Sequence, residues 1–185
     1  MTSNLESTGN VNTNFSIRQL IIVTLLSWLS QIGFDLFQNA GLFAKLWLES
    51  SAVFLPPEKM FKLIPLGYLS FLISSSMLVW LMVGLGISGW RNGALFGLKI
   101  GSFLSFAMVL GMASVFPVKS VLLAAWLFGG IGQNSIAALV IGSGLKRNAR
   151  LGRLTIKVIT FVIISAIVVI IMQNLGMSPA MEYVK

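Results

Sequence analysis

The stretch GALFGLKIGSFLS, from Gly93 to Ser105, has a glycine or serine at every fourth position. It begins an apolar run that continues to about Phe116. As an α-helix rising about 1.5 Å per residue, a run of this length crosses the roughly 30 Å hydrocarbon core of a bilayer. The sequence contains five such runs, at about 17–36, 63–84, 93–116, 121–145 and 158–175. Membrane-spanning strands need only about ten residues of alternating hydrophobicity, and these runs are longer. We therefore predict an all-α bundle of about five transmembrane helices.

The composition supports a membrane protein, because 56% of the residues are hydrophobic and only 10% are charged. A soluble domain is about one-quarter charged, since polar side chains must cover its core. The chain has no cysteine and no histidine, which excludes thiolate catalysis, histidine acid–base chemistry and the usual ligands of zinc and haem. With only five acidic residues, we expect no metal site and no cofactor. No acid–base pair is visible, so an intramembrane enzyme is the least supported class.

The predicted division is a polar disordered tail at 1–16, one transmembrane domain at 17–176 and a short tail at 177–185. Within the domain, the segment Gln38–Lys62 differs from the apolar runs because it carries charged side chains and the pair Pro56-Pro57. One side of its helical wheel is apolar and holds Leu42, Phe43, Leu46 and Trp47. This pattern predicts a short helix in the membrane interface, ended by the prolines. An irregular loop is the alternative.

Basic residues are concentrated between the last two runs, at Lys146, Arg147, Arg150, Arg153 and Lys157. The net charge of +8 would suggest a nucleic-acid partner for a soluble protein. A basic loop between apolar runs is instead typical of a cytoplasmic loop that meets anionic lipid. We therefore expect the bilayer, with anionic lipid at residues 146–157, and no nucleic acid. The positive-inside rule then places the N-terminus in the cytoplasm and the C-terminus outside.

A candidate polar site is formed by Lys99, Ser102, Gln133 and Asn134, which fall at similar depths in the third and fourth runs. Lys99 lies about six residues, or roughly 9 Å, into its run. A lysine at that depth either snorkels to the headgroups or lines a cavity that binds an anion or a carboxylate. The amides of Gln133 and Asn134 either belong to this cavity or hold helices together by hydrogen bonds.

Asp35 and Tyr68 form a candidate pair at the outer interface, because both fall near the outer ends of the first two runs. A hydrogen bond between them is one interpretation, and a carboxylate that faces water is the other. Lys99 is a poor partner for Asp35, since the 1.5 Å rise places the two roughly 18 Å apart in depth.

The third and fourth runs are predicted to form a tight antiparallel hairpin about Pro117-Val118. Small or short residues recur every fourth position, at Gly93, Gly97, Gly101 and Ser105 and at Gly130, Asn134, Ala138 and Gly142. Folding the chain at the proline pairs the first residue of one series with the last of the other, and so on inward. Small residues let helix backbones approach closely in lipid. The expected pairs are Gly93 with Gly142, Gly97 with Ala138, Gly101 with Asn134, and Ser105 with Gly130.

Two pieces, Leu42-Phe43-Ala44-Lys45-Leu46-Trp47 and Gly93-Ala94-Leu95-Phe96-Gly97, resemble features of small uncharacterised bacterial membrane protein families. Those families have a first helix, a short Leu-Phe-Gly-Lys-type segment and a Gly-rich helical hairpin. The resemblance covers about Ile17 to Leu145, and the fifth run departs from the four-helix pattern. It implies a multi-pass protein of the bacterial inner membrane, without an established activity.

Two hypotheses for the function follow from these features. The first is a non-enzymatic multi-pass membrane protein whose helices pack with a membrane-protein partner or with a second copy. The alternative is a small membrane carrier or channel with its polar site around Lys99, Gln133 and Asn134. No inverted repeat, which many transporters contain, is visible in the sequence.

Overall fold

The computed structural model describes residues 15–48 and 55–179, and all regular structure within these ranges is helical. The helices are α1 Ile17–Asp35, the π-helix η1 Leu36–Leu42, α2 Ala44–Leu48, α3 Pro57–Gly84, α4 Trp90–Val115, α5 Ser120–Gly144 and α6 Leu151–Asn174. Five segments are long and apolar enough to cross a membrane: α1 continued by η1, most of α3, and α4, α5 and α6. The prediction of an all-α multi-pass bundle is confirmed.

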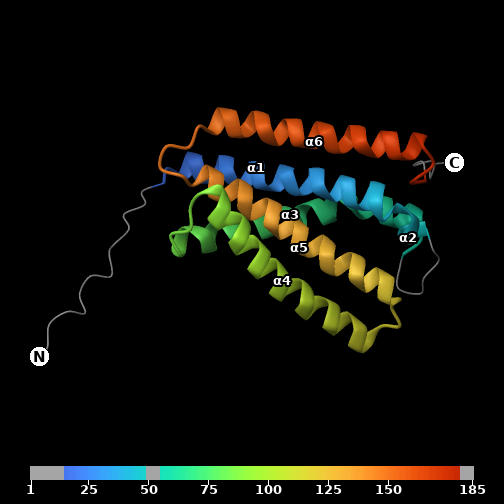
Figure 1. Cartoon of the computed structure of the whole chain (residues 1–185). Helices are drawn as coiled ribbons and strands as arrows, with labels where there is room; N and C mark the ends of the chain where they lie inside the picture. Colours follow the sequence, from blue (N-terminus) through green and yellow to red (C-terminus); the bar gives the residue numbers. More distant parts are fainter. Residues whose placement is uncertain (1–14, 49–54, 180–185) are drawn as a thin grey trace, which may run out of the picture.

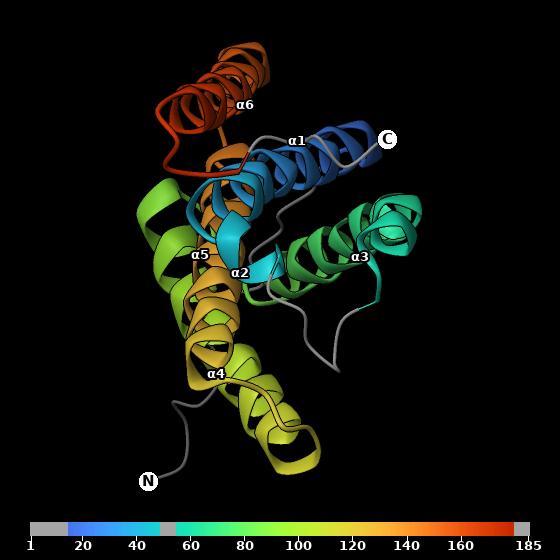
Figure 2. The same ribbon diagram turned by 90° about the vertical axis from the view of Figure 1, so that its right-hand side faces the viewer.

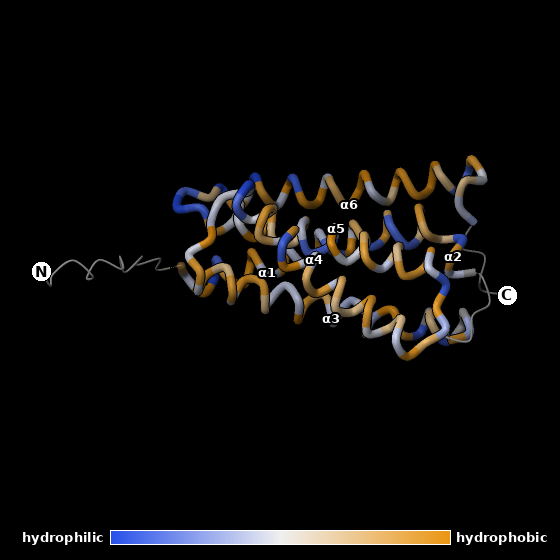
Figure 3. The backbone as a smooth tube through the Cα atoms, turned by 60° about the horizontal axis from the view of Figure 1, so that its bottom comes forward, coloured by the Kyte–Doolittle hydropathy of each residue, from blue (hydrophilic) through white to orange (hydrophobic). Residues whose placement is uncertain are grey.

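Helix α5 is central to the arrangement (Figure 1), with α4 packed on one side of it and α1 on another. Helices α3 and α6 both pack against α1, so α1 and α5 together contact every other long helix. Seen from the end of the bundle, α3 and the α4–α5 hairpin diverge from each other (Figure 2). Hydrophilic segments gather at the two ends of the bundle and apolar segments lie between them (Figure 3).

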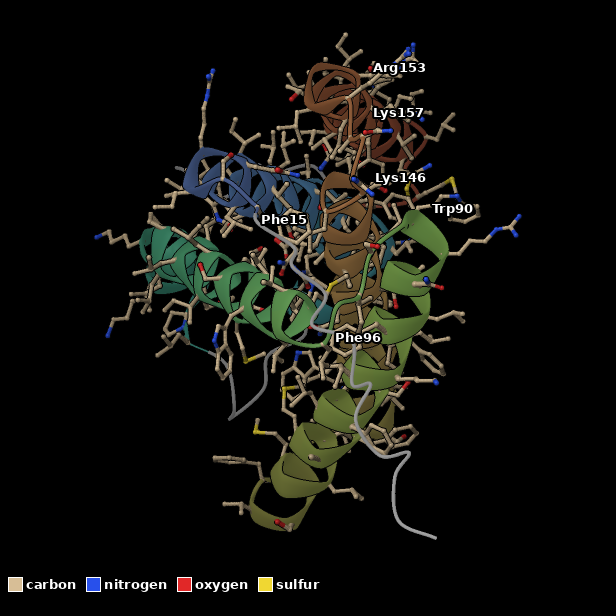
Figure 4. All side chains as sticks on the ribbon, turned by 90° about the vertical axis from the view of Figure 1, so that its left-hand side faces the viewer. Phe15, Trp90, Phe96, Lys146, Arg153 and Lys157 are labelled. Atoms are coloured by element: carbon tan, nitrogen blue, oxygen red, sulfur yellow. The ribbon has the colours of Figure 1, made fainter. Side chains whose placement is uncertain are left out.

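The apolar core lies between α1, α3 and α5, toward the end of the bundle that carries the α5–α6 loop. Its most buried members are Val23, Leu78, Met82, Ile141 and Leu145, of which none is more than 1% exposed. Phe15 and Phe96 pack against its edge, near the basic residues that surround the same end (Figure 4). Because these side chains fill the bundle at this end, the core closes the interior on the side of the basic loop.

Several helices extend beyond the predicted runs, and α3, for example, begins at Pro57 rather than near residue 63. Helix α6 begins at Leu151 rather than near residue 158, because Arg153 and Lys157 have stems long enough to carry their charges outward from a helix. Helix α1 continues without a break into η1, to Leu42. The short helix near Trp47 is α2, Ala44–Leu48. Most of the predicted tails at 1–16 and 177–185 lie outside the described residues, which leave out 1–14, 180–185 and the segment 49–54 before the prolines.

Candidate functional site

The structure brings together the four predicted pairs of the α4–α5 hairpin. A Cβ built on Gly93 would meet the carbonyl oxygen of Ala138 and would lie 3.2 Å from the Gly142 Cα. One on Gly97 would lie 2.7 Å from the Ala138 Cβ, and one on Gly101 would lie 2.9 Å from the Asn134 Cβ. One on Gly130 would meet the Ser105 hydroxyl. The two backbones therefore touch along this face, with no room for a larger residue.

Gly89 closes the hairpin at the end near the basic loop. Its backbone N–H donates a hydrogen bond of 2.7 Å to the carbonyl oxygen of Gly142. Its φ of 86° lies in the region that only glycine adopts readily. The start of α4 is thus fixed to the last turn of α5 by backbone atoms, and the hairpin is a rigid unit.

The residues of the predicted polar site are not brought together. Lys99 is exposed and lies two residues from both Gly97 and Gly101, or about 200° around α4 from the face that meets α5. The Asn134 amide donates a 2.8 Å hydrogen bond to the Gly130 carbonyl in its own helix. Ser102 is half-buried. Lys99 therefore faces away from α5, where the snorkelling interpretation fits it better than the cavity.

Gln133 lies on a different face of α5, opposite α1. Gly129, four residues before it, is in contact with the Gln38 amide of η1. Ala137, four residues after it, has its carbonyl oxygen 3.4 Å from the Ser27 hydroxyl of α1. Because residues four apart share one face of a helix, Gln133 faces α1 between these two contacts. Gln133 therefore belongs to the α1–α5 interface and not to the α4–α5 hairpin.

A buried polar cluster joins α1 to α3 in the middle of the bundle. The Gln31 amide donates a 2.7 Å hydrogen bond to the Ser75 hydroxyl, which is 3.1 Å from the Ser27 hydroxyl. Ser27 and Ser75 are 0% exposed and Gln31 is 2% exposed. Ser30 donates to the carbonyl oxygen of Ser27 within α1. Each of these side chains has a hydrogen-bond partner, so this cluster holds helices together in the way that polar groups do in lipid.

Three buried amide atoms have no partner, two of them in η1 at the end of α1 and one in the middle of α5. They are Gln38 Oε1, Asn39 Oδ1 and Gln133 Nε2, all buried and without a hydrogen bond in the structure. The Gln38 and Gln133 side chains are 6% and 9% exposed. A buried amide group without a partner costs about 1–3 kcal/mol. Unpartnered groups of this kind are therefore unusual in a packed helix interface.

The π-helix η1 shapes this end of α1. The Phe43 N–H donates to the Gln38 carbonyl at 2.8 Å, which is the five-residue spacing of a π-turn. Gly41 within it packs on α6, where an added Cβ would lie 3.3 Å from the Met172 sulfur. π-Turns inside α-helices are frequent at functional sites. Here the turn presents Gln38 toward α5.

Asp35 is placed beside η1, with Asn39 as its partner. The Asn39 amide donates a 2.7 Å hydrogen bond to the Asp35 carboxylate. Among the hydrogen bonds of the described residues, none joins Asp35 to Tyr68. The Tyr68 carbonyl instead accepts one from the Trp28 indole at 2.7 Å. The structure therefore gives the Asp35 carboxylate a partner, Asn39, other than the Tyr68 hydroxyl suggested by the sequence.

The polar positions of α1 were missed in the sequence, although their signal was present. Ser27, Gln31 and Gln38 are buried polar residues in an otherwise apolar stretch and lie along one side of the helix. Polar residues inside a transmembrane helix usually face the bundle interior. A search for polar residues at helical spacing in the first run would have found the row.

No known protein family, curated protein or solved structure matches this chain. The resemblance to small bacterial membrane protein families therefore stays a prediction. What the chain shows by itself is a multi-pass membrane protein with five apolar helices, a glycine-packed hairpin on one side of α5 and a buried, partly unpartnered polar row on the other.

Proposed function

We propose that this protein is a small membrane carrier or channel, with a polar site at the α1–α5 interface around Gln38 and Gln133. One observation carries this proposal. Gln38 Oε1 is an acceptor without a donor, and Gln133 Nε2 is a donor without an acceptor. Both lie at the α1–α5 interface. The Gln38 amide is in contact with Gly129 of α5, and Gln133 is one helical turn beyond Gly129 toward the basic end. A solute or water that both donates and accepts would satisfy the two amides.

The site continues inward as the row of Gln31, Ser75 and Ser27, and it ends at the apolar core. These side chains are neutral amides and hydroxyls, which suit a small polar cargo better than an anion. The closed core, with Val23 and Leu78 fully buried, fits a conformation shut on the side of the basic loop. Transport would require this core to open, as alternating access demands.

The orientation is part of the proposal. The basic end of the bundle carries Lys146, just after the end of α5, and Arg153 and Lys157, at the start of α6 (Figure 4). Arg91 lies over the Trp90 ring at the same end, 5.1 Å from its centroid, and aromatic rings of this kind anchor helices at interfaces. These features favour a cytoplasmic basic end that contacts anionic lipid, in a bacterial inner membrane.

A reporter fused after Lys185 tests the orientation. With five spans and a cytoplasmic N-terminus, a periplasmic reporter at this position is expected to be active and a cytoplasmic one inactive. The matched control is the same pair of reporters inserted in the loop at Asn148, where the result is expected to be reversed. A cytoplasmic signal after Lys185 would contradict either the orientation or the span count.

Transport is tested with the purified chain in proteoliposomes. Shrinkage and recovery after an osmotic jump are followed by light scattering with small neutral solutes and with monovalent salts. We expect faster recovery than in empty liposomes for at least one of them, and loss of this recovery in Gln133→Leu. The control is Asn174→Leu, an exposed amide at the end of α6, which should keep the wild-type rate. Equal rates for wild type, Gln133→Leu and empty liposomes across the panel would contradict the proposal.

A second candidate function, self-association without transport, is favoured by the exposed side of α4. This helix packs chiefly on α5, and Phe103 is 75% and Leu110 is 68% exposed. Because the chain has no cysteine, Phe103→Cys gives a clean test. Oxidative cross-linking in membranes should yield a dimer if copies meet along α4. Ile164→Cys, exposed on α6, is the control, and equal yields from both would indicate random collisions.

A further inference from the structure

We propose that the turn formed by Asp35 and η1 binds a monovalent cation, with oxygen ligands from Asp35, Gln38 and Asn39. The inference deepens the proposed function, on which it rests for what the cation does: a cation at this place is either the cargo or an ion that accompanies it. The proposed ligands all belong to this one turn, so cation binding can be measured separately from transport.

Two amide oxygens of this turn are buried without a hydrogen-bond donor. The Asn39 amide nitrogen donates to the Asp35 carboxylate at 2.7 Å, and this bond fixes the orientation of the amide. Its oxygen, Asn39 Oδ1, is then left buried without a donor, as is Gln38 Oε1. Two amide oxygens and a carboxylate therefore lie within five consecutive residues. Carboxylate and amide oxygens are the ligands that hard cations prefer.

Charge selects a monovalent cation. Asp35 is the one acidic residue in the five apolar segments, because Glu6, Glu49, Glu58 and Glu182 fall outside them. Among the described residues, no lysine or arginine forms an ion pair with the Asp35 carboxylate. A single negative charge in a membrane helix is costly unless it is paired. One positive charge neutralises it, whereas a divalent ion would leave a net charge in a poorly solvated place.

The position of the turn fits entry from the outer side. Helix α2 lies over this end of α1 and beside α5 (Figure 2). Trp47 of α2 meets Trp126 of α5, with ring centroids 6.5 Å apart. The turn is thus covered by a short helix rather than by the apolar core, which lies toward the other end of the bundle.

Cation binding is tested by the thermal unfolding of the full chain in mild detergent. The midpoint is measured in NaCl, KCl and choline chloride at constant ionic strength. A cation that binds only the folded state raises the midpoint as its concentration increases. We expect this rise with Na⁺ or K⁺ but not with choline, and no larger rise with Ca²⁺ or Mg²⁺. Asp35→Asn should abolish the response, whereas Glu182→Gln, which removes the same charge outside the apolar segments, should keep it.

A second variant covers the case in which Asp35→Asn does not fold. Gln38→Met keeps the volume and removes one oxygen, and it should weaken the apparent cation affinity about tenfold or more, as expected for a perturbed metal site. An equal response to choline, or a response unchanged in both variants, overturns the inference. Flux in proteoliposomes without any cation response would refute the cation site alone. A cation response without flux of any solute or ion would refute the transport proposal alone.

Discussion

The two sides of α5 are built differently. Against α4, residues such as Gly130, Ala138 and Gly142 let the backbones touch. Against α1, the same helix carries Gln133 with an unpartnered amide. The first interface is filled by close packing of the two helices. The second retains polar groups that its own neighbours do not satisfy. Close backbone packing is therefore on the α4 side of α5, and the unpartnered amide on which the proposed site depends is on the α1 side.

Gly97→Leu should have the largest effect, because this glycine is the most enclosed point of the hairpin. An added Cβ would already lie 2.5 Å from the Asn134 carbonyl oxygen and 2.8 Å from the Ser135 Cα. Both are backbone atoms, which cannot rotate away. We expect a loss of about 3 kcal/mol or more in the free energy of unfolding, measured by denaturant titration in detergent. Gly111→Leu is the matched control on the same helix, where no atom lies within 4 Å, and it should be nearly neutral.

Gly101→Leu should destabilise the protein less than Gly97→Leu and far more than Leu104→Ala. The nearest atom to a Cβ on Gly101 is the Asn134 Cβ at 2.9 Å, with backbone of Ile131 at 3.2 Å, so part of the strain can be relieved by the Asn134 side chain. We expect a loss of about 2 kcal/mol. Leu104 is 49% exposed, and its truncation should cost about 0.5 kcal/mol. Equal effects would show that the hairpin is not held by its small residues.

The hairpin register could be predicted from the sequence because its signal is local. The two series of small residues lie on consecutive helices, and Pro117 sets the point about which the chain turns. Two antiparallel helices joined by a short connection must meet, so the series themselves decide which positions face each other. No knowledge of the other helices is needed, and Gly97 meets Ala138 as the spacing requires.

The polar site could not be predicted in the same way. Gln31 of α1 donates a hydrogen bond to Ser75 of α3, and Gln133 is on the side of α5 that packs against α1. Which helices meet α1 depends on packing between segments far apart in the chain. The π-turn is equally non-local, because Gly41 meets Met172 of α6. Depth along each run placed Lys99 level with Gln133, but depth alone does not say which side of a helix a residue occupies.

Gln31→Leu probes the satisfied part of the α1 interface. It removes the hydrogen bond to the Ser75 hydroxyl, and interhelical hydrogen bonds in membranes contribute about 0.6–1.7 kcal/mol. We expect a loss of about 1 kcal/mol in the same unfolding assay. Ser76→Ala is the control, since Ser76 is exposed and bonds only to Leu72 of its own helix. A neutral Gln31→Leu would show that the polar cluster does not hold α1 to α3.

Gln133→Leu should have the smallest effect on stability and the opposite sign. The substitution removes a buried donor that has no partner in the structure, and it replaces an amide by an apolar group of similar size. Relieving such a group gains about 1 kcal/mol, while the imperfect fit of a branched side chain offsets part of the gain. We therefore expect stability equal to or slightly above wild type, together with loss of flux. If Gln133→Leu instead destabilises the protein as much as Gln31→Leu does, the Gln133 amide joins helices like the Gln31 amide. The difference between Gln31 at the α1–α3 interface and Gln133 on α5 would then disappear, and with it the main argument for a transport site.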